Sequence, residues 1–423
     1  MNKPLRTSYM HDPAAETRSA AVQEAFLSAS LRRIVKHAHT FAARTYQVFN
    51  EIGIDPASVL SIADLQRLPV TRKDDLGEIQ KASLPFGGLN AVVVDRLARI
   101  FMSPGNIYEP QGQGDDFWRF APGMTAAGFR SGDIIQNTFS YHMTPAGFMF
   151  DGAARSLGCV VVPAGTGQTD LQVQIAADVG VTGYTGTPSF LHTLLNRGRE
   201  LDRKLKFEVA FVSGEMLPNS LREELESDFG VRVLQGYGIA DLGLVAYECA
   251  EEKGMHVHHH CIVEIIDIAT GKRCAPGEVG EVVVTVFDEA YPLIRFGTGD
   301  LSCFMEETTC SCGRTAPRLA GWLGRVGDAV KVRGLFVRGS QIDSVMKKFP
   351  EVVRYEAVVT REGHHDELSY CVELQAPSAD PALITRLADA LREQVKVRGK
   401  VDVVAAGTIA PGAKKIDDRR VWK

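Results

Sequence analysis

The stretch Val209–Asp241 reads VAFVSGEMLPNSLREELESDFGVRVLQGYGIAD and carries the clearest structural signal in the chain. It opens with the apolar run Val209–Val212, continues with an amphipathic pattern near residues 218–229, and ends with a second apolar run at Arg232–Gln235. Short apolar runs separated by a helical period predict a strand, a helix and a second strand. Two strands joined by such a crossover lie parallel in one sheet.

The same alternation extends upstream of this stretch. Apolar runs occur at Ile134–Asn137, Val160–Pro163 and Gly183–Tyr184, and helical patterns follow near residues 145–157, 170–179 and 188–197. Repeated strand–helix units predict an α/β fold with a doubly wound parallel sheet and helices on both faces. The first hundred residues are predicted to be mainly helical.

Two regions downstream have different patterns. Strand-like segments at Ile262–Ile268, Glu281–Phe287 and Asp300–Phe304 follow one another without helices, which predicts a smaller β lobe. The last hundred residues mix strands and helices as in an α+β domain. We expect a large N-terminal domain at 1–326, with the β lobe at about 249–312, and a small mobile C-terminal domain at 327–423. The Gly-rich stretch 324–328 between them is a candidate hinge.

Composition excludes several classes of protein. The 423 residues include 47 Lys and Arg against 52 Asp and Glu, and a net charge of −5 does not suit a nucleic-acid binder. No apolar run approaches the ~20 residues of a membrane span. The N-terminus lacks the apolar core of a signal peptide, so we expect a cytoplasmic protein. In that reducing compartment the eight cysteines are expected to be free or metal-bound.

Three glycine-rich segments could bind a ligand. In Leu234–Asp241, glycines at a turn would let backbone amides approach a ligand, the ring of Tyr237 could stack on a base, and Asp241 could hold Mg²⁺. In Pro292–Asp300, the terminal carboxylate could accept both hydroxyls of a ribose. Phe211–Pro218 follows a strand, where parallel sheets bind ligands. Read singly, each segment could equally be an ordinary turn or a helix cap.

In this order, the three segments resemble those of the adenylate-forming ligases (AMP-forming acyl-CoA synthetases), most closely the phenylacetate–CoA ligase branch. The family equivalents are a GAEP-type, a YGxSE-type and a PLIRYRTGD-type segment. The stretch LQRLPVTRKDDL at residues 65–76 is similar to the family's LPxTxKxDL, and GRVGDAVKVRGLFVRGSQI at 324–342 is similar to its hinge region. The resemblance covers about residues 64–420.

The resemblance implies a two-step reaction. ATP and a carboxylic acid form an acyl adenylate, and the thiol of CoA then displaces AMP, with Mg²⁺ as a cofactor. The expected substrate is an aryl or aryl-acetic acid resembling phenylacetate, and the expected assembly is a homodimer. An alternative is an adenylating enzyme with another acceptor, such as a carrier protein or a deazaflavin. A second alternative is a non-catalytic homologue that binds a nucleotide or an acyl-CoA.

Nucleotide-binding residues follow from the same resemblance. The adenine site is expected to be lined by residues from two of the segments: Ser213, Gly214, Glu215, Gln235, Gly236, Tyr237 and Gly238. Asp241 is expected near Mg²⁺ or the α-phosphate, where it would act in catalysis. Asp300 and Arg325 are expected to reach the ribose.

The acyl pocket is expected beside the nucleotide. Its candidate residues come from the segment that corresponds to the family's aromatic-rich acyl-binding segment, with one addition next to Asp241: Phe139, Tyr141, His142, Thr144, Phe148 and Ala240. Aromatic rings are often buried for packing alone, so some of these could be core residues instead. His142 could equally be an exposed loop residue.

Three departures from the family pattern bear on catalysis. The phosphate loop, usually SSGTTGxP, here reads SPGNIYEP: Ser103 and Gly105 are kept, the Thr pair is lost, and Glu109 adds negative charge. The hinge has Gly327 in place of the first Asp. The C-terminal segment aligns Gly412 with the family's adenylation lysine, so Lys414 or Lys415 would have to replace it. The altered phosphate loop and the missing aligned lysine favour the non-catalytic alternative, whereas the retained YGxxD and TGD segments oppose it; glycine at the hinge still permits motion.

Cysteine and histidine spacing predicts a metal site. Cys249-x6-His256 and Cys310-x-Cys312 supply three thiolates and an imidazole, which is a known tetrahedral zinc set. The spacing alone leaves the question open, and the neighbouring histidines at 258–260 compete for the imidazole role. Relatives in the phenylacetate–CoA ligase branch carry the same pairs at the same places. The resemblance therefore implies a structural Zn²⁺ without an open position for water.

Overall fold

The computed structural model describes residues 7–420, apart from residues 8, 104–105, 308, 327–328, 333–334, 363–364 and 376–379. It forms two compact units. One comprises Met1–Thr298 and Ser302–Trp322, and the other comprises Gly299–Leu301 and Leu323–Lys423. The predicted domain boundary after residue 326 falls just inside the second unit. The altered hinge residue Gly327 lies outside the described residues.

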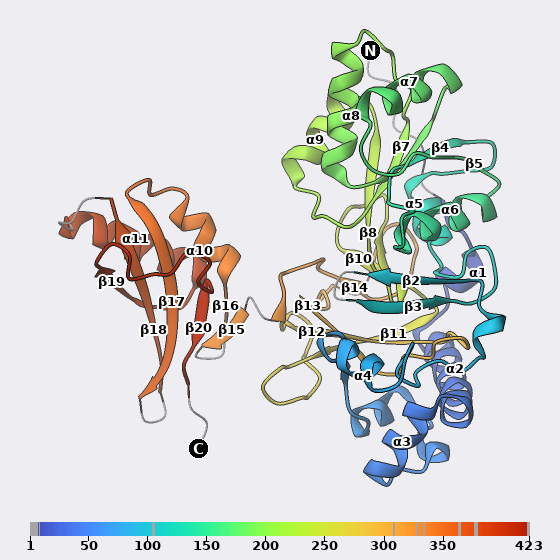
Figure 1. Ribbon diagram of the computed structural model, residues 1–423, viewed down its shortest axis with the longest axis horizontal. Coiled ribbons are helices and arrows are strands. Elements are labelled where there is room, and N and C mark those ends of the chain that lie inside the picture. Colours follow the sequence, from blue (N-terminus) through green and yellow to red (C-terminus); the bar gives the residue numbers. More distant parts are fainter. Residues whose placement is uncertain are drawn as a thin grey trace. The chain divides into compact units, whose positions relative to one another are not determined.

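An eight-stranded sheet dominates the first unit, with the strand order β14-β10-β9-β8-β7-β6-β4-β5 (Figure 1). Its parallel strands are β4 (Ile134–Asn137), β5 (Val160–Pro163), β6 (Gly183–Gly186), β7 (Val209–Val212) and β8 (Arg232–Ile239). The intervening helices are α6 (Ala146–Ser156), α7 (Thr169–Val179), α8 (Pro188–Glu200) and α9 (Asn219–Ser227). Every strand and helix predicted for residues 134–235 is present, and the α/β fold class is confirmed.

Strand β7 shows why this sheet is covered on both faces. Val209 and Phe211 pack in a cluster with α5 (Ala121–Ala127) and α6. Ala210 and Val212 pack in another cluster with α7, α8 and α9. Successive side chains of a strand point to opposite faces, so a run of four apolar residues supplies two cores. Figure 1 shows α8 and α9 on one side of this sheet and α5 and α6 on the other.

The glycines of the Leu234–Asp241 segment lie in a strand and not in the turn that was predicted for them. They lie within β8, which continues to Ile239 and then turns back into β9 (Gly243–Glu248) as its antiparallel neighbour. A Cβ atom on Gly236 would lie 2.5 Å from the ring of Phe211, and one on Gly238 would lie 2.8 Å from the ring of Phe120. Close packing against these rings, and not a tight turn, explains both glycines.

The predicted β lobe is divided between two sheets. β9, β10 (Met255–Val257) and β14 (Arg318–Leu319) form the antiparallel end of the eight-stranded sheet. A separate sheet has the order β1-β13-β12-β11, made of β1 (Thr71–Arg72), β13 (Phe296–Ser302), β12 (Gly280–Val286) and β11 (Cys261–Ile266). The prediction treated 249–312 as one lobe because all its strands are short and lack helices. The register with β8 assigns the first part to the larger sheet.

Helices and one hairpin complete the first unit. The α-helices are α1 (Pro13–Glu16), α2 (Ala20–Phe41), α3 (Ala43–Ile52) and α4 (Leu76–Ala82), with short 3₁₀ helices between and after them, so the helical prediction for this region is confirmed. β2 (Arg99–Ser103) and β3 (Ile107–Gln111) form an antiparallel hairpin. Its connection is the altered phosphate loop. None of the described helices is long and apolar enough to cross a membrane.

The second unit is an α+β domain. Its four-stranded sheet has the order β19-β18-β17-β20, made of β19 (Lys400–Val404), β18 (His365–Leu374), β17 (Val352–Glu362) and β20 (Ile416–Asp418). α10 (Gly339–Met346) and α11 (Pro381–Val395) pack in its core, and β15 (Ala329–Val332) pairs with β16 (Leu335–Arg338). β20 was not predicted, because its three residues lie in a basic segment. It is held by parallel pairing with β17.

Candidate active site

Hydrogen bonds join the two segments that were predicted to line the adenine. The Ser213 hydroxyl donates to the Gly236 carbonyl at 2.8 Å. The Leu217 amide donates to the side-chain oxygen of Gln235 at 3.4 Å. Both segments follow neighbouring parallel strands, whose carboxyl ends meet at one edge of the sheet. The structure therefore brings these predicted residues together.

Parts of the same segments remain accessible. Gly214 and Glu215 are exposed, and the φ angle of +80° at Gly214 is one that glycine adopts without strain. The Glu215 carboxylate accepts a hydrogen bond from Ser189 at 2.6 Å. Tyr237, half-buried, donates its hydroxyl to Thr298 on β13 at 3.3 Å, which fixes the plane of its ring. Accessible backbone and a partly exposed aromatic ring are features that suit a planar base.

Asp241 forms an ion pair that the sequence did not reveal. Its side chain is fully buried in the turn between β8 and β9, and its Oδ2 atom lies 2.7 Å from the Lys73 ammonium. Its Oδ1 atom has no hydrogen-bond partner within the described part of the chain. Lys73 lies in the LPVTRKDDL stretch, which was quoted for its resemblance but given no role. Lys73 and Asp241 are 168 residues apart, so only the three-dimensional structure shows that they are in contact.

Glu109 is the other buried carboxyl group near this pair. It is 2% exposed on β3, and neither of its oxygens has a hydrogen-bond partner among the described residues. Burial, and secondarily the charge of Asp241, raises the pKa of Glu109 to about 7, against the lowering effects of Ser103 and Lys73. The negative charge predicted for the phosphate loop is thus partly suppressed at neutral pH.

The rest of the phosphate loop is only partly described. Ser103 ends β2, and its hydroxyl is buried without a partner in the described chain. Gly105 lies outside the described residues. Ser103 and Ile107 pair with each other across the hairpin formed by β2 and β3.

The two predicted ribose-binding residues contact each other. The Arg325 guanidinium lies 3.2 Å from a carboxylate oxygen of Asp300, and the two residues also form a backbone bridge. Asp300 is 6% exposed, whereas the Arg325 side chain is 61% exposed. The arginine can therefore turn toward a ligand while the aspartate stays fixed. Both belong to the second unit by their contacts.

Aromatic side chains of the predicted acyl segment form a cluster. The rings of Tyr141 and Phe148 are 5.2 Å apart, and Phe101 lies 5.4 Å from Phe148. The Tyr141 hydroxyl accepts a hydrogen bond from Asn137 and donates one to Asp151. Its pKa is raised by burial. These contacts hold Tyr141 as a fixed wall.

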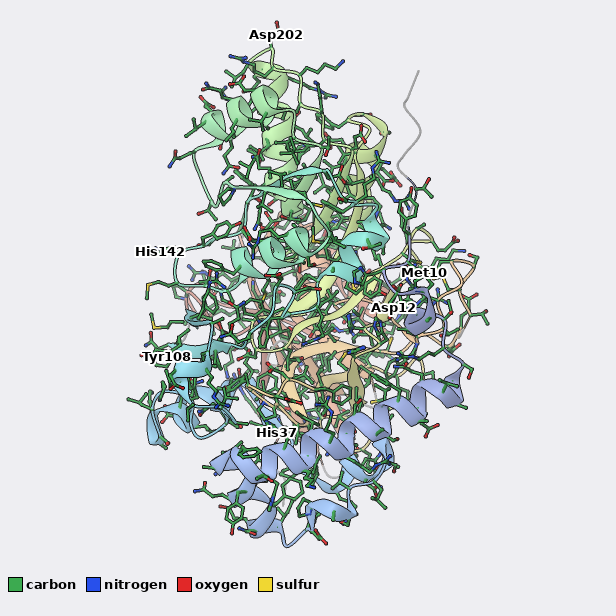
Figure 2. All side chains as sticks on the ribbon, turned by 90° about the vertical axis from the view of Figure 1, so that its right-hand side faces the viewer. Met10, Asp12, His37, Tyr108, His142 and Asp202 are labelled. Carbon is green, nitrogen blue, oxygen red and sulfur yellow. The ribbon has the colours of Figure 1, made fainter. Side chains whose placement is uncertain are left out.

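The remaining acyl candidates are less alike. Phe139 stacks on Phe150 with ring centres 4.4 Å apart, so it is largely a core residue. Ala240 packs against the same core. Thr144 is half-buried and donates to the Ser140 carbonyl at 3.4 Å. Figure 2 shows His142 at the surface of the first unit. It is exposed, which agrees with the alternative reading of this residue as part of a surface loop.

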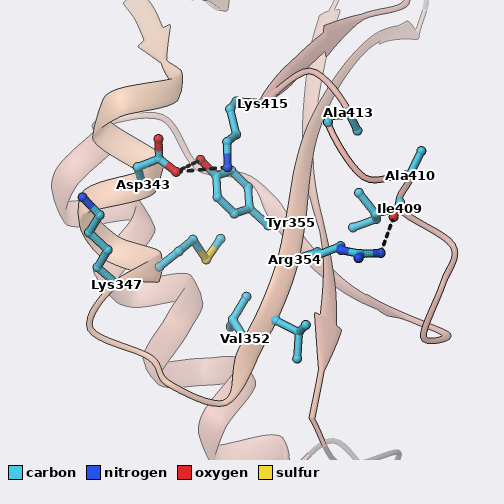
Figure 3. A pocket seen from close by; sticks show the side chains of 12 residues that line it. Asp343, Lys347, Val352, Arg354, Tyr355, Ile409, Ala410, Ala413 and Lys415 are labelled. Atoms are coloured by element: carbon cyan, nitrogen blue, oxygen red, sulfur yellow. Dashed lines mark hydrogen bonds and ion pairs between the residues drawn. The ribbon is translucent and has the colours of Figure 1, made fainter.

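The two C-terminal lysine candidates differ in their surroundings. Lys415 lies 3.3 Å from Asp343 and 4.5 Å from the ring centre of Tyr355, and Tyr355 donates to the same Asp343 oxygen at 2.6 Å. Figure 3 shows these three side chains converging at one side of a cavity of about 340 Å³. Lys414 is exposed. Lys415 is therefore engaged within the second unit, and Lys414 is the more available cation.

The four predicted metal ligands converge. One ligand atom from each of Cys249, His256, Cys310 and Cys312 lies within 4.8 Å of the others. Hydrogen bonds from Cys249 and, to a lesser degree, His256 hold the pKa of Cys312 far below its ordinary value, to about 2. A thiolate is the form that binds a metal. Three sulfurs and one imidazole at this spacing fit a tetrahedral zinc ion.

His256 is the imidazole of this cluster, and its neighbours are not. Its Nε2 atom faces Cys312 at 3.4 Å, and its Nδ1 atom lies 3.2 Å from the Ala316 carbonyl, the usual second contact of a metal-binding histidine. His258 and His259 instead stack on each other with ring centres 4.6 Å apart. The competition that the sequence left open is thereby resolved.

The fold and these segments define an adenylate-forming enzyme, and comparison with known proteins agrees. The AMP-binding enzyme family matches residues 119–286, and the AMP-binding enzyme C-terminal domain matches residues 334–421. The phenylacetate–coenzyme A ligase of Thermus thermophilus is 32% identical over 95% of both chains. That of Escherichia coli is 31% identical over 86% of this chain and 85% of its own.

A solved structure extends the likeness to the fold. A 2-hydroxyisobutyryl-CoA ligase in complex with 2-HIB-AMP and CoA is 25% identical, with a TM-score of 0.85 over 98% of this chain and 96% of its own. The chain therefore belongs to the AMP-forming acid–thiol ligases, in the family of the phenylacetate–CoA ligases. The predicted family is confirmed.

Proposed function

We propose that this protein is an ATP-dependent carboxylate–CoA ligase that activates an aryl or aryl-acetic acid through an acyl adenylate. The observation that carries the proposal is the backbone hydrogen bond from Met102 to Met143, 2.8 Å long. It ties the aromatic acyl segment to the hairpin that carries the phosphate loop. The acid and the phosphates would therefore meet between them, and the Tyr141 and Phe148 rings would bound a flat, apolar substrate.

The ammonium group beside Asp241 supplies chemistry that adenylation needs. A carboxylate attacking the α-phosphorus builds negative charge on the phosphate oxygens, and a fixed ammonium stabilises that charge. Lys73 is such a group, held by Asp241. Arg325, whose side chain is exposed and paired with Asp300, would contact the ribose.

Magnesium fits the same place. The Oδ1 atom of Asp241 is buried and without a partner in the described chain, and carboxylate oxygens are the ligands that Mg²⁺ prefers. When bound there, Mg²⁺ would neutralise charge on the triphosphate. Protonation of Glu109, whose pKa is about 7, removes its repulsion of the phosphates in the same region. The altered phosphate loop is therefore compatible with ATP.

Zinc and self-association belong to the same proposal. The Cys249, His256, Cys310 and Cys312 cluster would hold a structural Zn²⁺ between the end of β9, strand β10 and the turn before β14. All four ligands would come from the protein, so the ion would not activate water. By resemblance to the family we also propose a homodimer.

Acid-dependent release of pyrophosphate from ATP tests the proposal. Aromatic, aryl-acetic and short aliphatic acids would be screened with and without CoA. We expect release with an aryl or aryl-acetic acid and thioester only when CoA is present. Release without thioester would indicate another acceptor, such as a carrier protein or a deazaflavin.

Two observations favour the non-catalytic alternative. Glu109 adds a carboxyl group to the phosphate loop, and Lys415 is engaged by Asp343 within the second unit. Folded protein that binds AMP but releases no pyrophosphate with any acid would replace the ligase proposal with this one.

A further inference from the structure

A buried carboxylate behind the predicted adenine site is bonded to one of its lining residues. Glu248, 4% exposed at the end of β9, accepts hydrogen bonds from both nitrogens of Gln235: the backbone amide at 2.9 Å and the side-chain amide at 2.8 Å. The side-chain oxygen of Gln235 in turn accepts from the Leu217 amide. Glu248 thus reaches both segments that line the site without belonging to either.

Arg222 stabilises the buried carboxylate of Glu248. One of its nitrogens lies 2.8 Å from each oxygen of Glu248, and another donates to the Val233 carbonyl. Arg222 is 7% exposed on α9. A buried carboxylate is tolerated when a cation and hydrogen bonds satisfy it. Here four donor contacts from two residues occupy its two oxygens.

We infer that Glu248 is a positioning residue for the nucleotide, holding Gln235 and, through it, Leu217, so that the two lining segments keep one spacing. The inference rests on the proposed function, because it requires that these segments bind ATP. The next residue, Cys249, belongs to the metal cluster, and Glu248 pairs with Met255 across β9 and β10. A metal ion held by that cluster would anchor the strand end from which Glu248 acts.

Glu248→Gln is the variant that tests this role. The amide keeps the size of the side chain but turns one oxygen into a donor, which then faces a donor of Gln235 or Arg222. A cavity of about 420 Å³ lined by Arg222, Gln235 and Glu248 can admit water to the lost contact, which favours folding. We expect the KM for ATP to rise at least tenfold while kcat changes less than threefold.

Glu264→Gln is the matched control. Glu264 is 3% exposed on β11 and pairs with Arg295 at 3.0 Å and Arg273 at 2.9 Å, and neither of these ion pairs involves the two segments predicted to line the adenine. We expect a similar fall in Tm with an unchanged KM. Equal falls in Tm with an unchanged KM in both variants would overturn the inference.

A double variant tests whether Glu248 acts through Gln235. Gln235→Met removes the side-chain amide but keeps the backbone amide that also donates to Glu248, so adding Glu248→Gln to it should raise the KM by less than the same change does in the wild type. Additive increases would overturn the inference. If Glu248→Gln fails to fold, Arg222→Lys replaces it, because lysine keeps the charge but only part of the hydrogen bonding. We then expect a threefold or larger rise in KM, and no rise overturns the inference. Wild-type protein that binds no ATP would instead overturn the proposed function itself.

Discussion

The Lys73 ammonium lies 2.7 Å from the Oδ2 atom of Asp241, across 168 residues of sequence. The pair joins the first turn before α4 to the turn between β8 and β9. The pair places one cation against the buried acid of the predicted active site. The family's C-terminal adenylation lysine, by contrast, is replaced by Gly412 in the aligned sequence.

Replacing Lys73 by methionine should abolish most adenylation. The change removes the cation expected to stabilise phosphate charge and leaves Asp241 buried and unpaired. We expect acid-dependent pyrophosphate release to fall at least ~100-fold. Lys81→Met, on the exposed surface of α4, is the control and should leave release unchanged. Near-normal release by a folded Lys73→Met variant would contradict the role given to this lysine.

Glu109→Gln should make stability less sensitive to pH. The pKa of Glu109 is about 7 in the folded state, above its ordinary value of 4.5. Between these values the folded state keeps a proton that the unfolded state releases, so wild-type stability falls as pH rises and levels off above about 7. Urea unfolding from pH 4.5 to 8 should show the variant gaining stability relative to wild type, by on the order of 3 kcal/mol at the plateau.

The affinity for ATP should follow the same titration. Ionised Glu109 repels phosphates, so the wild-type affinity should fall as pH rises through 7, whereas the variant should keep a flatter profile. Calorimetric titration of both proteins with ATP and Mg²⁺ at three pH values measures this. Parallel profiles for the two proteins would show that Glu109 does not face the phosphates.

Removing the metal cluster should destabilise the first unit. We expect one zinc ion per chain, measured by release to a chromogenic chelator. Cys312→Ser should abolish that release and lower the free energy of unfolding by at least about 2 kcal/mol. Cys371→Ser, on β18 of the second unit, is the control and should retain the ion. A full complement of zinc in Cys312→Ser would refute the ligand set.

Replacing each of the two C-terminal lysines should affect adenylation to different degrees. Lys414 is exposed and Lys415 is held by Asp343 and Tyr355, so we expect Lys414→Ala to lower adenylation at least tenfold. Lys415→Ala should leave adenylation within threefold and lower the stability of the second unit by about 1 kcal/mol or less. Pyrophosphate release, compared with thioester formation from acyl adenylate supplied directly, resolves the two steps. The reverse assignment of defects would identify Lys415 instead.

The sequence predicted the elements whose signal is local. The run Val209–Val212 indicates a buried strand because each face of β7 needs apolar residues, and the amphipathic pattern after Pro218 indicates α9. The three-residue strand β20 gave no such signal, since its pairing with β17 depends on a partner about sixty residues away. The glycines of β8 were noticed for their identity, but their reason, the rings of Phe211 and Phe120, lies outside the segment.

The metal cluster shows what the spacing of cysteine and histidine residues in the sequence can and cannot predict. The pairs Cys310-x-Cys312 and Cys249-x6-His256 pointed to four residues whose ligand atoms the structure brings within 4.8 Å of one another. The choice of His256 over its neighbours was not fixed by spacing. It follows from the position of His256 on β10, where the ring faces Cys312 and its other nitrogen lies near a backbone carbonyl.

By itself, the sequence determined the α/β class, the order of its elements and the family, because periodicity and ordered motifs are properties of neighbouring residues. Only the tertiary structure decided which charges meet. The fold brings Lys73 to Asp241 and Glu109 into the same buried region, and it brings Glu248 together with Arg222 and Gln235. Burial then sets the protonation of these groups and the strength of their electrostatic interactions, since the energy of a charge depends on the groups and the water around it.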